Sequence, residues 1–212
     1  MRMIPWRSCH VCTNPRVAEL PLCTPCLERF DRETTDRPPV RLSPEGCPIR
    51  ASFWYEGFPR EMFLLAKFQG DRAIADFLIG KAFGRLGSPD GIRLWLPVPP
   101  DTGRLLRRGI FLPDRMAYRF SRLTGIPWSA EGGRPRTGVE SKFMGKTERS
   151  SMGEDRWISL PGSTPGQGVC LLDDLVTTGE TLRSFVRFRR RQGDHVIMAS
   201  TLFDSRLRLD GP

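Results

Sequence analysis

The stretch that most constrains the fold covers residues 169–182 and reads VCLLDDLVTTGETL. Its first four residues form an apolar run without a helical period, which is typical of a strand buried on both faces. Asp173 and Asp174 follow as an acidic turn, residues 177–179 are small and polar, and a helical pattern comes next. The order is therefore strand, acidic turn, polar loop and helix.

This order favours a particular ligand. A loop that leads into a helix presents several backbone N–H groups to one point, and that geometry favours a phosphate. The acids suit the hydroxyls of a ribose, or a hydrated Mg²⁺ that accompanies a diphosphate. The alternative is an ordinary turn before a capped helix, because Asp and Thr favour turns and N-caps for local reasons. The candidate phosphosugar-binding residues are Asp173, Asp174, Thr177, Thr178, Gly179, Glu180 and Thr181.

Residues 173–181, DDLVTTGET, resemble the loop with which type I phosphoribosyltransferases bind 5-phosphoribosyl 1-diphosphate (PRPP). The resemblance implies an α/β fold in which a parallel sheet is flanked by helices. It also implies that PRPP binds together with Mg²⁺. Asp173 and Asp174 are the catalytic candidates if the chain is an enzyme.

Two cysteine pairs near the N-terminus predict a small metal-binding domain. Cys9, Cys12, Cys23 and Cys26 form two C-x2-C pairs separated by ten residues. Two such pairs can meet at one tetrahedral Zn²⁺, which would supply much of the folding energy of so short a segment. Two disulfides do not suit a reducing cytoplasm, and a redox dithiol needs one pair only. His10 is interpreted as a bystander.

Length and composition bound the remaining possibilities. The 212 residues suffice for one α/β domain with a small appendage, and 39% hydrophobic with 27% charged residues is typical of a globular protein. No apolar run approaches the roughly 20 residues of a membrane span. The N-terminus lacks the apolar core of a secretory signal, so we expect a cytoplasmic protein.

Periodicity predicts the other elements. Residues 27–48 are charged and proline-rich and are typical of a linker, so the chain divides into a zinc-binding domain with linker (1–48) and a phosphoribosyltransferase-like domain (49–212). Residues 187–191, RFRRR, are typical of a solvated helix end. Strands are expected at 51–57, 94–98 and 196–203, and helices at 59–68, after Gly70, at 111–123 and after Gly179.

The middle of the chain carries much of the formal net charge of +9, because residues 101–150 contain 11 basic and 5 acidic side chains. Such a region suits nucleic acid or the phosphates of a small ligand. Arg104, Arg107 and Arg108 follow a predicted strand and are candidates for holding a pyrophosphate, although they equally suit an exposed helix face. Residues 125–168 form a long Gly- and Pro-rich segment, part of which we expect to close over a ligand.

The order of motifs along the whole chain resembles the ComF family of competence-associated proteins: the cysteine pairs, YEG at 55–57, AKFQG at 66–70, LPVP at 96–99, RRG at 107–109 and the acidic loop. The resemblance implies a role in DNA uptake during natural transformation, with single-stranded DNA and a helicase-like protein as partners. The RRG motif continues with Ile110 where family members have Phe-Asn-Gln, so the pyrophosphate half of the site departs from the family.

Three hypotheses follow from the sequence. The first is a ComF-like protein that binds PRPP or a related phosphosugar. The second is an active phosphoribosyltransferase of nucleotide metabolism. The third is an adaptor that binds single-stranded DNA and keeps only a relic of the PRPP pocket.

Overall fold

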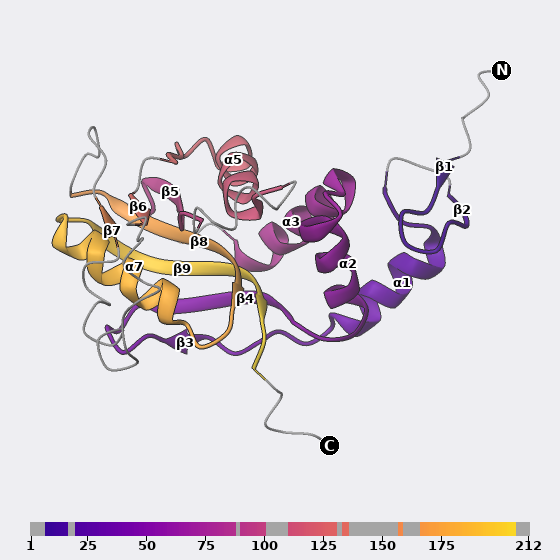
Figure 1. Cartoon of the computed structure of the whole chain (residues 1–212), viewed down its shortest axis with the longest axis horizontal. Coiled ribbons are helices and arrows are strands. Elements are labelled where there is room, and N and C mark those ends of the chain that lie inside the picture. Colours follow the sequence, from indigo (N-terminus) through magenta and orange to yellow (C-terminus); the bar gives the residue numbers. More distant parts are fainter. Residues whose placement is uncertain are drawn as a thin grey trace, which may run out of the picture.

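The computed structural model describes residues 7–16, 20–87, 90–100, 110–130, 133–135, 157–158 and 166–206. Its centre is a sheet of five strands in the order β3-β4-β9-β8-β5 (Figure 1). β4, β9, β8 and β5 are parallel, and the short β3 runs antiparallel to β4 at one edge. The strands are β3 (Arg41–Leu42), β4 (Pro48–Trp54), β5 (Leu94–Pro97), β8 (Gly168–Val176) and β9 (His195–Asp204). The predicted α/β fold with a mostly parallel sheet is confirmed.

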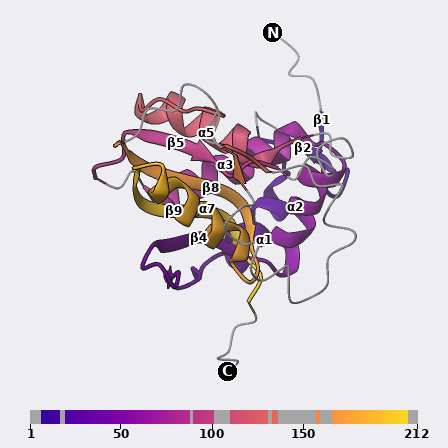
Figure 2. The same cartoon turned by 60° about the vertical axis from the view of Figure 1, so that its left-hand side comes forward.

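Helices cover both faces of this sheet, and the alternation of side chains along β8 explains why. Cys170 and Leu172 point into the core cluster formed with α2, α3 and α5, whereas Val169 and Leu171 point into the cluster formed with α7. All four side chains are fully buried, as a strand covered on both faces requires. In Figure 2, β5 and β8 run between α5 and α7. The helices are α2 (Gly57–Phe68), α3 (Arg72–Leu86), α5 (Leu112–Thr124) and α7 (Glu180–Arg191).

The strand predicted at residue 169 is longer than expected. β8 continues through Val176, so both acids lie inside the strand and not in a turn after it. The reason is the length of β9, which supplies pairing partners as far as Asp204: Asp173 is opposite Thr201 and Val176 is opposite Asp204. The polar loop therefore begins at Thr177.

The interpretation of residues 27–48 as a linker is wrong, because most of α1 (Thr24–Glu33) and all of β3 fall within this range. Phe30 of α1 is fully buried, with its ring centroid 5.4 Å from that of Phe53 and 5.1 Å from that of Phe77. Phe30, which lies between charged residues in the sequence, anchors α1 against the main core together with Cys26. The division of the chain at residue 48 stays a prediction.

Two small two-stranded sheets complete the described structure. β1 (Arg7–Ser8) pairs with β2 (Pro15–Arg16) beside the start of α1, remote from the sheet (Figure 1). β6 (Arg134–Pro135) pairs with β7 (Trp157–Ile158) against α7, where Trp157 Nε1 donates a 3.0 Å hydrogen bond to Ser184 Oγ. Within the described ranges, no helix is both long enough and apolar enough to cross a membrane.

Candidate functional site

The polar loop lies between the end of β8 and the start of α7. Thr177 and Thr178 are exposed, and α7 begins at Glu180. Gly179 has a φ of +80°, a conformation that glycine adopts without the penalty a Cβ would bring. The first N–H groups of a helix lack partners inside the helix, so this turn directs donors towards one point. A turn of this kind is able to bind an anion.

Asp174 is held by a lysine from another element. Lys67 Nζ, near the end of α2, lies 2.7 Å from Asp174 Oδ2 and 2.8 Å from Oδ1, and both residues are buried. The same Nζ lies 4.8 Å from the centre of the Phe63 ring. An ion pair of this kind fixes the direction of the carboxylate.

Asp173 is in a different electrostatic state. Burial, together with the neighbouring charge of Asp174, raises the pKa of Asp173 to about 7. Its Oδ1 accepts a 2.8 Å hydrogen bond from the backbone N–H of Asp174. The two adjacent acids therefore differ: Asp174 is paired with Lys67, whereas the pKa of the Asp173 carboxyl lies near neutral pH.

Arg41 of β3 contacts the polar loop, and no motif in the sequence predicts this contact. Its guanidinium donates a 3.0 Å hydrogen bond from Nη1 to the carbonyl oxygen of Thr177, and Nη2 pairs with Asp204 at the end of β9. Arg41 lies in the segment 27–48 that was interpreted as a linker, 136 positions before Thr177. Nothing local in the sequence marks it, because the contact exists only once β3 has paired with β4.

The arginine run at 187–191 is not simply a solvated helix end, which corrects the expectation from the sequence. Arg189 is buried and pairs with Asp194, which is also buried. Arg187 Nε lies 2.6 Å from Glu45 Oε1, and Arg190 donates to the Glu45 carbonyl oxygen at 2.5 Å. Arg187 and Arg190 therefore hold the turn between β3 and β4 against α7.

Several predicted features fall outside the described residues. Arg104, Arg107 and Arg108, the pyrophosphate candidates, are among them, as is most of the segment 125–168. Their relation to the acids and to the polar loop stays a prediction.

The four cysteines come together as the sequence predicted. Cys9, Cys12, Cys23 and Cys26 have sulfur atoms within 4.8 Å of one another, and the Sγ atoms of Cys12 and Cys23 are 3.5 Å apart. Ligands about 2.3 Å from a tetrahedral Zn²⁺ would be separated by about 3.8 Å, so the cluster fits a metal ion. His10 is directed elsewhere: its Nδ1 lies 2.7 Å from Oδ2 of Asp71, the N-cap of α3.

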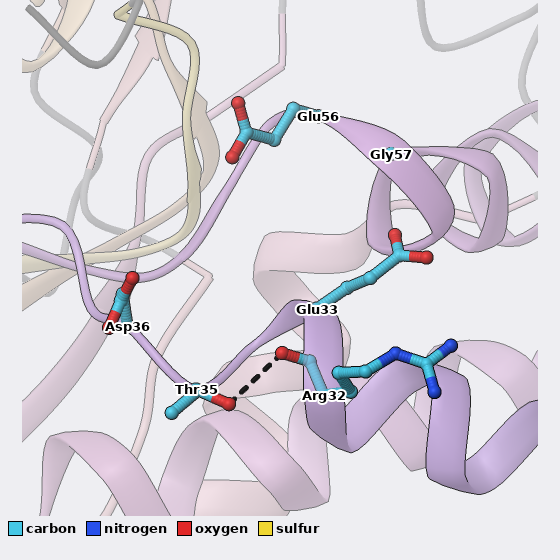
Figure 3. Close-up of a pocket in the computed structure, with 6 residues that line it drawn as sticks. All are labelled: Arg32, Glu33, Thr35, Asp36, Glu56 and Gly57. Carbon is cyan, nitrogen blue, oxygen red and sulfur yellow. Dashed lines mark hydrogen bonds between the residues drawn. The ribbon is translucent and has the colours of Figure 1, made fainter. Parts of the chain in front are cut away.

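A cavity of about 380 Å³ lies between the end of α1 and the start of α2 (Figure 3). It contains none of residues 173–181, and three of its lining side chains are acidic, which does not suit a phosphate. Glu33 Oε2, on its wall, accepts a 2.6 Å hydrogen bond from the backbone N–H of Phe58. The lining residues are Arg32, Glu33, Thr35, Asp36, Glu56 and Gly57.

Comparison with known proteins gives only distant structural similarities. No family model matches the sequence, and no curated protein matches it significantly. Orotate phosphoribosyltransferase from Aeropyrum pernix is 14% identical with a TM-score of 0.42, over 84% of this chain and 81% of that one. Leishmania donovani UMP synthase is 18% identical with a TM-score of 0.40, over 78% of this chain and 28% of that one.

A third solved structure is similar to the same degree. Adenine phosphoribosyltransferase from Thermoanaerobacter pseudethanolicus is 15% identical with a TM-score of 0.40, over 65% of this chain and 83% of that one. At such TM-scores these similarities say nothing about what this chain binds.

Proposed function

We propose that the chain binds PRPP or a related phosphorylated ribose at the carboxyl end of β8. The proposal rests on one observation: acids, a polar loop and a helix start follow one another along residues 173–181. They lie at the carboxyl end of a parallel strand, where α/β proteins bind ligands. The backbone and hydroxyls of Thr177, Thr178 and Thr181 would hold the 5′-phosphate. Mg²⁺ would accompany the diphosphate and offset its charge.

The two acids would have separate roles in this site. Asp173 would accept hydrogen bonds from the ribose hydroxyls, since no cation in the described part of the chain forms an ion pair with its carboxyl. Asp174 would fix the direction of the strand end through its contact with Lys67. Catalysis by this pair is proposed only for the enzyme hypothesis, in which pyrophosphate leaves with help from Mg²⁺ and the arginines of the 104–108 loop.

Calorimetry of the full chain with PRPP and Mg²⁺ tests the proposal. We expect one molecule bound per chain, and an affinity at least tenfold lower for Asp173→Asn, a loss of about 1.4 kcal/mol. The matched control is Thr35→Ala, which alters an exposed threonine on the wall of the acidic cavity and should bind as the unaltered chain does. Equal binding by Asp173→Asn would refute the assignment.

We further propose that the cysteine cluster holds a structural Zn²⁺. Support comes from the four sulfurs, which form a closed set of soft ligands, and from the burial of Cys9, Cys23 and Cys26. The bound ion would join the β1–β2 hairpin to the start of α1.

The wider biological role is proposed from the sequence motifs alone. They favour a ComF-like cytoplasmic protein acting in DNA uptake, with single-stranded DNA and a helicase-like protein as partners. Pyrophosphate release with a nitrogen nucleophile would identify an active phosphoribosyltransferase. An adaptor that only binds DNA would instead lose affinity steeply with salt and would ignore Asp173→Asn.

A further inference from the structure

Arg41 contacts the backbone of the polar loop, and the orientation of one peptide follows from that contact. Its Nη1 donates to the carbonyl oxygen of Thr177 at 3.0 Å, while Nη2 pairs with Asp204, which is only 1% exposed. Arg41 is itself largely buried, with 11% of its side chain accessible. Nη2 of the guanidinium is thus fixed by Asp204 of β9, and Nη1 holds the loop.

In a trans peptide the C=O and N–H groups point in opposite directions. No cis peptide bond occurs in the described part of the chain. Because Arg41 holds the carbonyl of Thr177, the N–H of Thr178 in the same peptide points away from Arg41. Gly179 then turns the chain with its positive φ, and the first N–H groups of α7 follow. Successive N–H groups arranged in this way make a concave site for an anion.

The charges beside this peptide are also unbalanced. Asp204 accepts from Arg41 and also from Arg206, whose backbone N–H lies 2.9 Å from Oδ1 and whose Nη2 lies 3.2 Å from Oδ2. Two guanidinium groups therefore share one carboxylate at the start of the loop. These two cations would attract a dianionic phosphate in the loop.

We propose that Arg41 is a positioning residue of the phosphate loop, which orients the Thr177–Thr178 peptide so that the Thr178 N–H donates to the bound phosphate. This inference rests on the proposed function. It adds to that function a residue outside the acidic loop and explains why the site needs β3. A purely structural role would need only the pair with Asp204.

The test is an NMR titration of the full ¹⁵N-labelled chain with inorganic phosphate and with ribose 5-phosphate. In the unaltered chain, the Thr178 amide proton shifts downfield as the phosphate binds, together with the amides of Glu180 and Thr181. In Arg41→Gln the Thr178 shift falls to less than a third, the α7 amides keep responding, and the affinity drops about tenfold. Should Arg41→Gln fail to fold, Arg41→Lys keeps a cation beside Asp204, cannot reach both acceptors, and gives the same loss.

Two controls separate positioning from charge and from general stability. Arg206→Gln removes a contact to Asp204 but leaves the Thr177 carbonyl untouched, so its Thr178 response is retained. Arg37→Gln removes another bond from an arginine to a backbone carbonyl, the 3.1 Å contact with Arg85, and leaves the titration unchanged. If the Thr178 response in Arg41→Gln equals that in the unaltered chain, only the role proposed for Arg41 is refuted, and the phosphosugar site is not. If no amide of residues 177–182 responds in the unaltered chain, the phosphosugar site itself is refuted.

Discussion

Lys67 Nζ lies 2.7 Å from Oδ2 of Asp174, and this contact joins the end of α2 to the last part of β8. The opposite end of α2 is joined to α1, because Glu33 accepts the N–H of Phe58. α1 begins between Cys23 and Cys26. A continuous set of contacts therefore runs from the cysteine cluster through two helices to the acids of the candidate site.

The Lys67–Asp174 pair should be costly to break from one side. Lys67→Met leaves a buried carboxylate without its cation, and we expect the free energy of unfolding to fall by about 3–5 kcal/mol. Urea denaturation measures this. Lys81→Met is the control, because its pair with Asp31 is exposed and should contribute less than about 1 kcal/mol. Similar losses in the two variants would show that burial does not govern the Lys67 pair.

Gly57 tests the junction between α1 and α2. A Cβ at this position would lie 2.5 Å from Glu33 Oε2, and φ is +52°. Gly57→Ala should therefore lower the free energy of unfolding by more than the backbone strain of an alanine at this φ would cause by itself. The additional loss, from the Glu33 contact, should be about 1–3 kcal/mol. Gly46→Ala is the matched control, since φ is +72° there and a Cβ would meet no atom within 4 Å. Equal losses would mean that the Glu33 contact is unimportant.

Metal removal should destabilise more than the N-terminal hairpin. Cys9, Cys23 and Cys26 belong to the same core cluster as Phe30, Phe53 and Phe77. If the three cysteines lose their order, the apolar surface that α1 buries becomes exposed. Mass spectrometry of the purified chain should find about one Zn²⁺, and a chelator should lower the melting temperature of the whole chain. Cys12→Ser should lose the ion, whereas Cys47→Ser, outside the cluster, should keep it. A chelator that leaves the melting temperature unchanged would contradict this.

Asp173 should make stability depend on pH. Its folded-state pKa is raised from 3.8 to about 7, so the folded state binds more protons than the unfolded state between these values. The contribution of Asp173 to stability therefore falls as pH rises from about 4 to about 7 and is constant above. Asp173→Asn should gain stability relative to the unaltered chain over this range, measured by urea denaturation at several pH values. A difference that does not vary with pH would exclude the raised pKa.

The sequence predicted those parts of the molecule whose signals are local. The apolar run at 169–172 and the spacing of the cysteines were sufficient for the first part of β8 and for the cysteine cluster, because both signals come from residues close together in the chain. The end of β8 was not predictable locally, since it is set by the partners that β9 offers.

Contacts between distant segments were also missed. α1 is charged apart from a few apolar positions, and its helical state depends on the burial of Phe30 against β4 and α3. Arg41 and Lys67 reach the site from β3 and α2; Lys67 lies in the AKFQG motif, but nothing around either residue indicates which group it contacts. Such contacts arise only from the tertiary arrangement.

The most direct test of the phosphosugar site is a calorimetric titration of the full chain with PRPP and Mg²⁺, repeated with saturating ribose 5-phosphate. We expect saturable binding of one PRPP per chain, and its displacement by ribose 5-phosphate, because both ligands would place a phosphate in the loop at residues 177–181. Absence of PRPP binding at millimolar concentration, or PRPP binding that ribose 5-phosphate does not affect, would contradict the site proposed for this chain.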